Sequence, residues 1–230
     1  LAPFIYMLFS AFKTEGEAIA YPPKLLPAEW HFENFINAWK SQPFGTYLWN
    51  SILVTVLTTV GQVLSCSLVA YGFARFNFKG KALVKSFFFS PLIVPGIVVG
   101  FSLFQFLLVK LNLSVYMSLF IGHTVVIIPY IIRVVGSSLE GFDYSIEEAA
   151  MSLGCKKSLT FFKVVLPNIT SGVMAAFMLA FINSFNNVPV SMFLTGPGVS
   201  TLPITMMNYV EYNYDPTVSA LSVILMILTI

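Results

Sequence analysis

Three asparagines in an apolar part of the chain are the side chains best suited to bind a small polar molecule. Asn183, Asn186 and Asn187 lie within a mostly apolar stretch from 169 to 194. A carboxamide both donates and accepts hydrogen bonds, so it suits a neutral hydroxylated solute. The alternative is that these amides join neighbouring membrane helices, a frequent role of asparagine. Both interpretations stay open, and the three asparagines are the candidate residues of a solute pathway.

The other polar residues of the apolar stretches do not form a catalytic or metal-binding set. Four apolar stretches are long enough to cross a membrane, at about 47–74, 86–109, 113–135 and 169–194, and they contain no Asp or Glu. Of the two histidines, His31 lies in a loop and His123 lies in one of these stretches. Because an enzyme or a metal site needs several such groups together, we predict no catalytic residue, no metal and no cofactor. An isolated His123 is more typical of a hydrogen bond to a neighbouring helix. The chain also lacks the GxxxxGK[ST] pattern of a P-loop, so ATP hydrolysis is expected in a partner.

A loop at about 140–168 carries the signals of a helical hairpin. Ser145 followed by Glu148 has the spacing of a capping box, in which each side chain satisfies a backbone amide of the first turn. Gly154 suits the left-handed position that ends a helix. The spacing therefore predicts a short helix between Ser145 and Gly154.

A second helix is predicted to follow, and Pro167 is expected to end it. Its apolar side consists of residues at helical spacing, namely Leu159, Phe162, Val165 and Leu166. The first helix presents small and apolar residues, namely Ala149, Ala150, Met151 and Leu153. Such a tip suits insertion into a groove on another protein, and the alternative is a hairpin that lies on the membrane surface. The residues alone leave both interpretations open.

The elements that must position these residues are membrane helices. Of the 230 residues, 57% are hydrophobic and only 10% are charged, whereas a soluble domain carries about a quarter charged residues. A spanning helix needs about 20 mostly apolar residues. Helices are predicted at about 1–12 (partial), 47–74, 86–109, 113–135, 169–194 and 216–230 (partial). The predicted fold is an all-α polytopic membrane protein, a single domain over 1–230 with six crossings, of which the first and last are truncated.

Basic residues indicate the orientation of these helices. Most of them fall in two places along the chain, which hold Arg75, Lys79, Lys81 and Lys85, and then Arg133, Lys156, Lys157 and Lys163. Since basic residues in short loops stay on the cytoplasmic side, the hairpin at 140–168 is predicted to face the cytoplasm. The opposite side holds segment 13–46, in which residues 30–39 form either a short amphipathic helix or an ordered loop.

The hairpin carries a pattern that resembles a known family. Glu148-Ala149-Ala150 is followed after three residues by Gly154, then after nine residues by Val164, one further residue and Leu166-Pro167. This string resembles the EAA loop of the permease subunits of ABC importers, with Val164 in place of the usual Ile. The resemblance implies a coupling helix that docks into a cleft of a separate ATPase subunit. The residues that it assigns to this coupling interface are Glu148, Ala149, Ala150, Leu153, Gly154, Leu166 and Pro167.

The resemblance extends over nearly the whole chain. Residues 11–85 resemble carbohydrate importer permeases related to the maltose system, whereas residues 91–219 are more similar to polyamine permeases. It implies a six-helix bundle of the type I importer kind in the bacterial inner membrane, with a sugar or a polyamine as solute. The implied partners are ATPase subunits, a second permease subunit, an extracytoplasmic solute-binding protein and the lipid bilayer, with no nucleic acid. The alternative function is an ion-coupled secondary transporter, although the spans lack the carboxylates expected of one.

Overall fold

The computed structural model describes residues 2–41, 43–212 and 215–229. Across these ranges the chain is built of helices and loops and contains no β-strand. A helix satisfies its own backbone hydrogen bonds, which is what an apolar segment needs in the hydrocarbon core of a bilayer. The predicted all-α class is confirmed.

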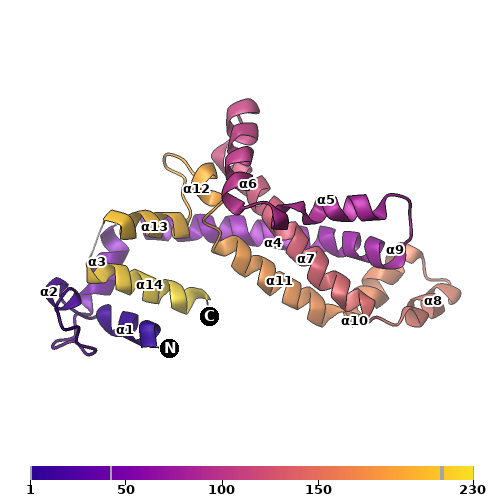
Figure 1. Cartoon of the computed structure of the whole chain (residues 1–230). Coiled ribbons are helices and arrows are strands. Elements are labelled where there is room, and N and C mark those ends of the chain that lie inside the picture. The colour runs from indigo at the N-terminus through magenta and orange to yellow at the C-terminus, as the bar shows by residue number, and fades with distance from the viewer. Residues whose placement is uncertain (1, 42, 213–214, 230) are drawn as a thin grey trace. The chain divides into compact units, whose positions relative to one another are not determined.

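The chain divides into two compact units, and Figure 1 shows their helices. The first unit consists of Leu1–Ser51 and Gly196–Ile230, and the second unit of Ile52–Thr195. Helix α4 (Phe44–Arg75) begins in the first unit and continues in the second. The interpretation of 1–230 as a single domain stays a prediction.

The second unit contains both the hairpin and the asparagines. After α4 its helices are α5 (Lys81–Ile93), α6 (Gly96–Leu103), the π-helix η1 (Phe104–Lys110), α7 (Val115–Glu140), α8 (Tyr144–Ser152), α9 (Lys157–Thr160), the π-helix η2 (Phe161–Val165), α10 (Leu166–Asn168), α11 (Thr170–Phe185) and α12 (Ser191–Leu194). Helices α7 and α11 pack side by side along much of their length (Figure 1). Helices α5 and α12 also pack against α7, which makes α7 the centre of this unit.

Two helices are long and apolar enough to cross a membrane by themselves, α4 and α7. They confirm the helices predicted at 47–74 and 113–135, although α7 continues to Glu140. Helix α7 begins where it does because the side chain of Ser114 accepts the N–H of Met117 and so caps its first turn.

The other two predicted spans of this unit are broken. The path from α5 through α6 and η1 bends by 103° at a break that contains Pro95, which has no N–H to continue the helix. The prediction of one helix over 169–194 is wrong, because α11 ends at Phe185. Beyond that end, Oδ1 of Asn187 accepts the N–H of Val190 at 3.0 Å and closes a turn before α12. A side-chain amide that bonds the local backbone competes with the helix in this way.

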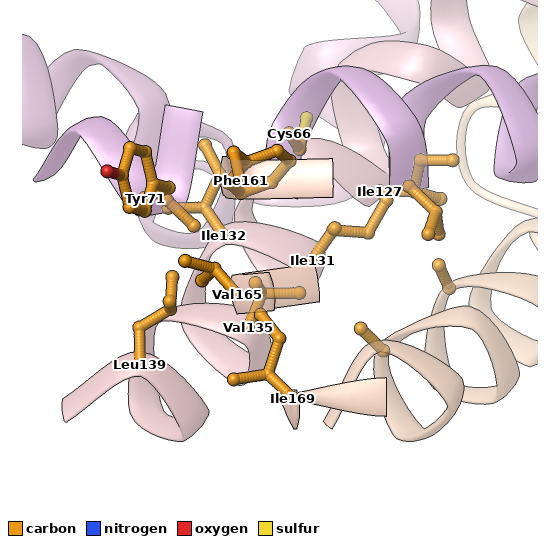
Figure 2. Close-up of a cluster of buried hydrophobic side chains, with 14 residues drawn as sticks. Cys66, Tyr71, Ile127, Ile131, Ile132, Val135, Leu139, Phe161, Val165 and Ile169 are labelled. Atoms are coloured by element: carbon orange, nitrogen blue, oxygen red, sulfur yellow. The ribbon is translucent and has the colours of Figure 1, made fainter. Parts of the chain in front are cut away.

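The core of the second unit lies where α4, α7, η2 and α11 meet. Figure 2 shows its buried side chains, of which α7 contributes Ile127, Ile131, Ile132, Val135 and Leu139 at helical spacing. Helix α4 adds Cys66 and Tyr71, and η2 adds Phe161 and Val165. The second arm of the hairpin is therefore part of this core and not a loop on its surface.

The first unit contains α1 (Ala2–Ser10), α2 (Glu15–Ala18), α3 (Glu33–Ser41), α13 (Leu202–Tyr212) and α14 (Pro216–Thr229). Helix α14 packs against α1 and α3, and α13 packs against α14. Helix α3 decides between helix and loop in the segment 30–39, since that segment is helical from Glu33 onward. The sequence pattern did not predict α13, whose first N–H, that of Leu202, donates to Oγ of Ser51 at 2.8 Å.

Candidate functional site

Helix α8, the first arm of the hairpin, starts with a cap other than the predicted one. Asp143 is the N-cap, and its side chain accepts the N–H of Ser145 at 2.9 Å. Hydrogen bonds from the backbone and then the side chain of Ser145 hold the pKa of the Asp143 carboxyl below its usual value. The predicted capping box of Ser145 and Glu148 is wrong, because a helix capped by Asp143 has Ile146 and not Glu148 at its third position.

Helix α8 ends at Ser152, and Gly154 takes the left-handed position after it, as predicted. The φ angle of Gly154 is +88°, the left-handed conformation that glycine adopts without steric cost. Its N–H donates to the carbonyl of Met151 at 2.9 Å, and the N–H of Cys155 donates to the carbonyl of Ala150 at 3.1 Å. These two bonds form a complete Schellman motif, which satisfies carbonyls at the helix end and fixes the direction of the second arm.

One face of α8 is apolar and exposed. Ile146, Ala149 and Leu153 recur at helical spacing and so share this face, and 90% of Leu153 is exposed. Ala150 and Met151 are half-buried at its edge. An exposed apolar patch of this kind, with two large residues on either side of a small one, is typical of a surface that contacts another protein.

The opposite side of α8 is tied to the end of α4 by a cluster of charged and aromatic side chains. Glu147 is fully buried, and its Oε1 accepts a hydrogen bond from the Tyr71 hydroxyl. Arg75 reaches both neighbouring acids: its Nε lies 3.5 Å from Oε2 of Glu147, and its Nη2 donates to Oε1 of Glu148 at 2.8 Å. The Arg75 guanidinium also lies 5.1 Å from the centroid of the Tyr144 ring. Because Glu147 is fully buried and its contacts come from Tyr71 and Arg75, this cluster attaches α8 to the end of α4.

Sequence reasoning did not place Tyr71 or Arg75 in the site. Arg75 entered it only as one of several basic residues that indicate orientation. The signal that could have found it is the pair Glu147-Glu148, because two adjacent acids in a short helix need a cation when one of them faces the core. Nothing in the sequence pattern marked Tyr71.

The second arm does not present the predicted apolar side. Phe161 and Val165 are buried, whereas Leu159 is 43% exposed and Phe162 is 52% exposed. The reason is η2, because π-helical hydrogen bonds reach one residue further and change which side chains face the core. Pro167 does not end this arm: the helix continues through α10, and the bend of 79° to α11 follows it.

The predicted coupling residues fall in two places within the second unit. Glu148, Ala149, Ala150, Leu153 and Gly154 come together on α8 and at its end. Leu166 and Pro167 lie instead on the second arm, where they line an apolar groove of about 330 Å³ together with Val63 and Leu64 of α4.

Two of the three predicted asparagines line one cavity. Its volume is about 380 Å³, and its walls include the break between α5 and α6, Tyr130 of α7, Asn183 and Asn187. Asn186 is exposed and is not one of the lining residues. Asn183 donates from Nδ2 to the carbonyl of Leu179 at 2.8 Å, within its own helix. The volume falls in the range of about 300–1,000 Å³ that is usual for small-molecule sites.

His123 joins helices, as its isolation in the sequence predicted. Its Nδ1 lies 2.8 Å from Oγ of Ser184 on α11, and its Nε2 lies 3.0 Å from Oγ of Ser191 on α12. Ser184 also donates to Oγ1 of Thr55 on α4 at 3.4 Å. This buried network connects four helices of the second unit, and the interpretation of His123 as a hydrogen-bonded helix contact is confirmed.

Most of the chain, including the hairpin and the cavity, matches a known protein family. Residues 66–230 match the family described as "Binding-protein-dependent transport system inner membrane component", a match that covers more than half of the chain. The chain belongs to this family. It is a permease subunit of an ABC importer in the inner membrane, and an ion-coupled secondary transporter is not favoured.

Relatives of this permease include proteins named for sugar transport and for polyamine transport. It is 31% identical to the sulfoquinovosyl glycerol transport system permease protein SmoH of Agrobacterium fabrum, over 97% of this chain and 80% of the relative. It is 33% identical to the spermidine/putrescine transport system permease protein PotC of Escherichia coli, over 79% of this chain and 69% of the relative. It is 27% identical to the diacetylchitobiose uptake system permease protein DasC of Streptomyces coelicolor, over 90% and 75%. The double resemblance seen in the sequence is therefore confirmed.

Solved structures show the same fold. The permease superimposes on a chain of a bacterial ABC transporter involved in the import of the acidic polysaccharide alginate with a TM-score of 0.80, at 18% identity, covering 96% of this chain and 84% of that one. It also superimposes on a chain of the MetNI methionine ABC transporter with a TM-score of 0.63, at 19% identity, covering 82% and 92%. The predicted importer-permease fold is confirmed.

Proposed function

We propose that this permease forms half of a pathway for a neutral, hydroxyl-rich solute and is driven by ATP hydrolysis in a separate subunit that contacts α8. The observation that carries this proposal is the exposed apolar face of α8, whose opposite side is fixed to α4 through Glu147. A face that is exposed and yet firmly held can receive a movement from a partner and pass it on. ATP hydrolysis is assigned to the partner because the chain contains no P-loop.

The proposed contact buries Leu153 in a groove of the ATPase subunit. Full burial of a leucine side chain is worth about 1.5–3 kcal/mol, and 90% of this residue is exposed in the free chain. Ala149 and Ala150 permit close approach of the partner's backbone because they carry only a methyl group. A second permease subunit would complete the pathway, and an extracytoplasmic solute-binding protein would deliver the solute.

The cavity at the break between α5 and α6 favours a neutral solute. Asn183, Asn187 and Tyr130 offer hydrogen-bond donors and acceptors, which suit hydroxyl groups. The lining residues include no Asp or Glu that could balance a charged solute. The name of DasC designates diacetylchitobiose, a neutral carbohydrate, and agrees with this assignment, whereas the name of SmoH designates a carbohydrate that carries a sulfonate.

A polyamine is the second candidate. The observation that favours it is the 33% identity to PotC, which covers 79% of this chain. The aromatic ring of Tyr130 could also contact an ammonium group.

Uptake into vesicles separates the candidates. The permease is reconstituted with its partner permease, ATPase subunits and binding protein, and uptake of diacetylchitobiose, sulfoquinovosyl glycerol and spermidine is compared with and without ATP. We expect ATP-dependent uptake of the neutral diacetylchitobiose and none of spermidine. Uptake of spermidine alone, or of the anionic sulfoquinovosyl glycerol alone, would contradict the neutral-solute assignment, and uptake that needs no ATP would contradict the proposed function as a whole.

A substitution in the cavity completes this experiment. Asn183→Ala removes an amide from the cavity wall, and we expect it to raise the KM of the transported carbohydrate about tenfold, the worth of one hydrogen bond, at unchanged maximal rate. Asn168→Ala is the matched control, because Asn168 also donates to a carbonyl of its own chain, that of Val164 at 2.7 Å, but does not line the cavity. Equal KM values for the two variants would remove Asn183 from the pathway.

A further inference from the structure

Tyr71, near the C-terminal end of α4, contacts both arms of the hairpin. Its hydroxyl donates to Glu147 on the first arm. Its ring lies 5.0 Å from the ring of Phe161 on the second arm, measured between centroids, and Figure 2 shows the two rings side by side. The Tyr71 side chain therefore connects both arms of the hairpin to α4.

Arg75 lies one helical turn beyond Tyr71 and completes the connection. It pairs with Glu147 and Glu148, and its guanidinium lies over the Tyr144 ring. The distance of 3.5 Å from Nε of Arg75 to Oε2 of Glu147 is longer than the roughly 2.8 Å of a close charge-assisted hydrogen bond. Oε2 of Glu147 has no hydrogen-bond partner among the described residues. Arg75 therefore supplies the positive charge that faces this oxygen.

We propose that Tyr71 and Arg75 are positioning residues that clamp α8 to α4, so that a displacement of α8 moves the membrane-spanning helix instead of only bending the hairpin. This inference rests on the proposed function, in which α8 receives that displacement from the ATPase subunit. It adds the route by which the movement leaves the hairpin: from Glu147 through the Tyr71 hydroxyl into α4, and from Phe161 through the Tyr71 ring into the same turn.

The chain offers a matched pair of substitutions that test the clamp. Tyr71→Phe removes only the hydroxyl that bonds Glu147 and keeps the ring that packs on Phe161. Tyr144→Phe removes a buried hydroxyl that has no hydrogen-bond partner among the described residues and keeps the ring beneath Arg75. In the reconstituted complex, we expect Tyr71→Phe to lower solute uptake per ATP hydrolysed about tenfold, the worth of a hydrogen bond to a charged group, and Tyr144→Phe to leave it unchanged.

A third variant and a measurement of assembly separate coupling from folding. Arg75→Lys keeps a positive charge but loses the planar fork that reaches two acids, so we expect uptake per ATP between that of wild type and Tyr71→Phe. The amount of complex that assembles should be the same for all variants. Wild-type uptake per ATP in Tyr71→Phe would overturn the clamp, and so would a loss of assembly that accounts for the whole fall in uptake. Failure of the proposed function is distinguishable, because the wild-type complex itself would then show no ATP-dependent uptake.

Discussion

Valine in place of Gly154 is expected to uncouple ATP hydrolysis from solute uptake. Gly154 ends α8 with a φ of +88°, a conformation that costs other L-residues about 1–2 kcal/mol and β-branched residues more. The strain would open the Schellman turn, in which Cys155 bonds the carbonyl of Ala150, and displace the exposed face of α8. We expect uptake to fall about tenfold or more, while ATP hydrolysis and the amount of permease in the membrane are retained. Uptake and hydrolysis are measured on the same vesicles.

Asparagine at the same position is the control for this result. Apart from its two chain neighbours, no described residue has an atom within 4 Å of the place where a Cβ on Gly154 would sit, so the expected effect of valine comes from backbone conformation and not from a clash. Asn adopts the left-handed conformation more readily than other residues, and Gly154→Asn should therefore transport nearly as well as wild type. Normal uptake by the valine variant would show that the geometry of the turn is not needed for coupling.

Alanine in place of Gly100 is expected to destabilise the permease by about 1–3 kcal/mol, because it overfills a close contact between α6 and the segment before α12. A Cβ on Gly100 would lie 2.6 Å from the carbonyl oxygen of Pro189 and 3.0 Å from the Cα of Val190. Both are backbone atoms, so the contact cannot be relieved by turning a side chain. A lower thermal unfolding temperature in detergent is the measurement.

Gly136→Ala provides the comparison. Gly136 lies inside α7, and no described atom outside its chain neighbours and the nearby backbone of α7 lies within 4 Å of the place where its Cβ would sit. Alanine is favoured over glycine in a helix by about 1 kcal/mol, so this variant should be as stable as wild type or slightly more stable. If Gly100→Ala unfolded at the same temperature as Gly136→Ala, the close packing of α6 on this segment would be refuted.

The sequence predicted the long helices well because composition and length decide them. The expected limits of 47–74 and 113–135 agree with α4 and α7 to within a few residues. The breaks in the other spans were harder to predict. Pro95 is a signal that could have indicated one of them, but the end of α11 depends on Asn187 bonding the N–H of Val190, a local competition that an apolar pattern does not reveal.

The hairpin shows the same division between local and long-range causes. Gly154 could be predicted because its role depends only on the adjacent turn. The roles of Glu147 and Glu148 could not be predicted from the hairpin alone, because both acids pair with Arg75, which lies far away in the sequence. The capping box failed for a local reason as well, because Asp143 and not Ser145 caps α8, and the Glu148 carboxylate pairs with Arg75 of α4 instead.

The second arm and α13 show how packing overrides periodicity. A regular helix would place Phe162 with Val165, but η2 turns Phe161 inward instead. Helix α13 begins at Leu202, where the N–H donates to a serine on α4, a contact that no pattern within 202–212 indicates.

Chemical capture of the ATPase subunit from α8 tests the central claim most directly. Cys155, the native thiol beside α8, is first replaced by serine, while the buried Cys66 is kept. Ala149→Cys places a thiol on the exposed face of α8, and Leu111→Cys places one before the start of α7, at the opposite end of that helix from the hairpin. With a short thiol-to-amine crosslinker in a complex that is transporting solute, we predict capture of the nucleotide-hydrolysing subunit from position 149 and not from position 111. A transporting complex in which position 149 never captures that subunit would contradict the account.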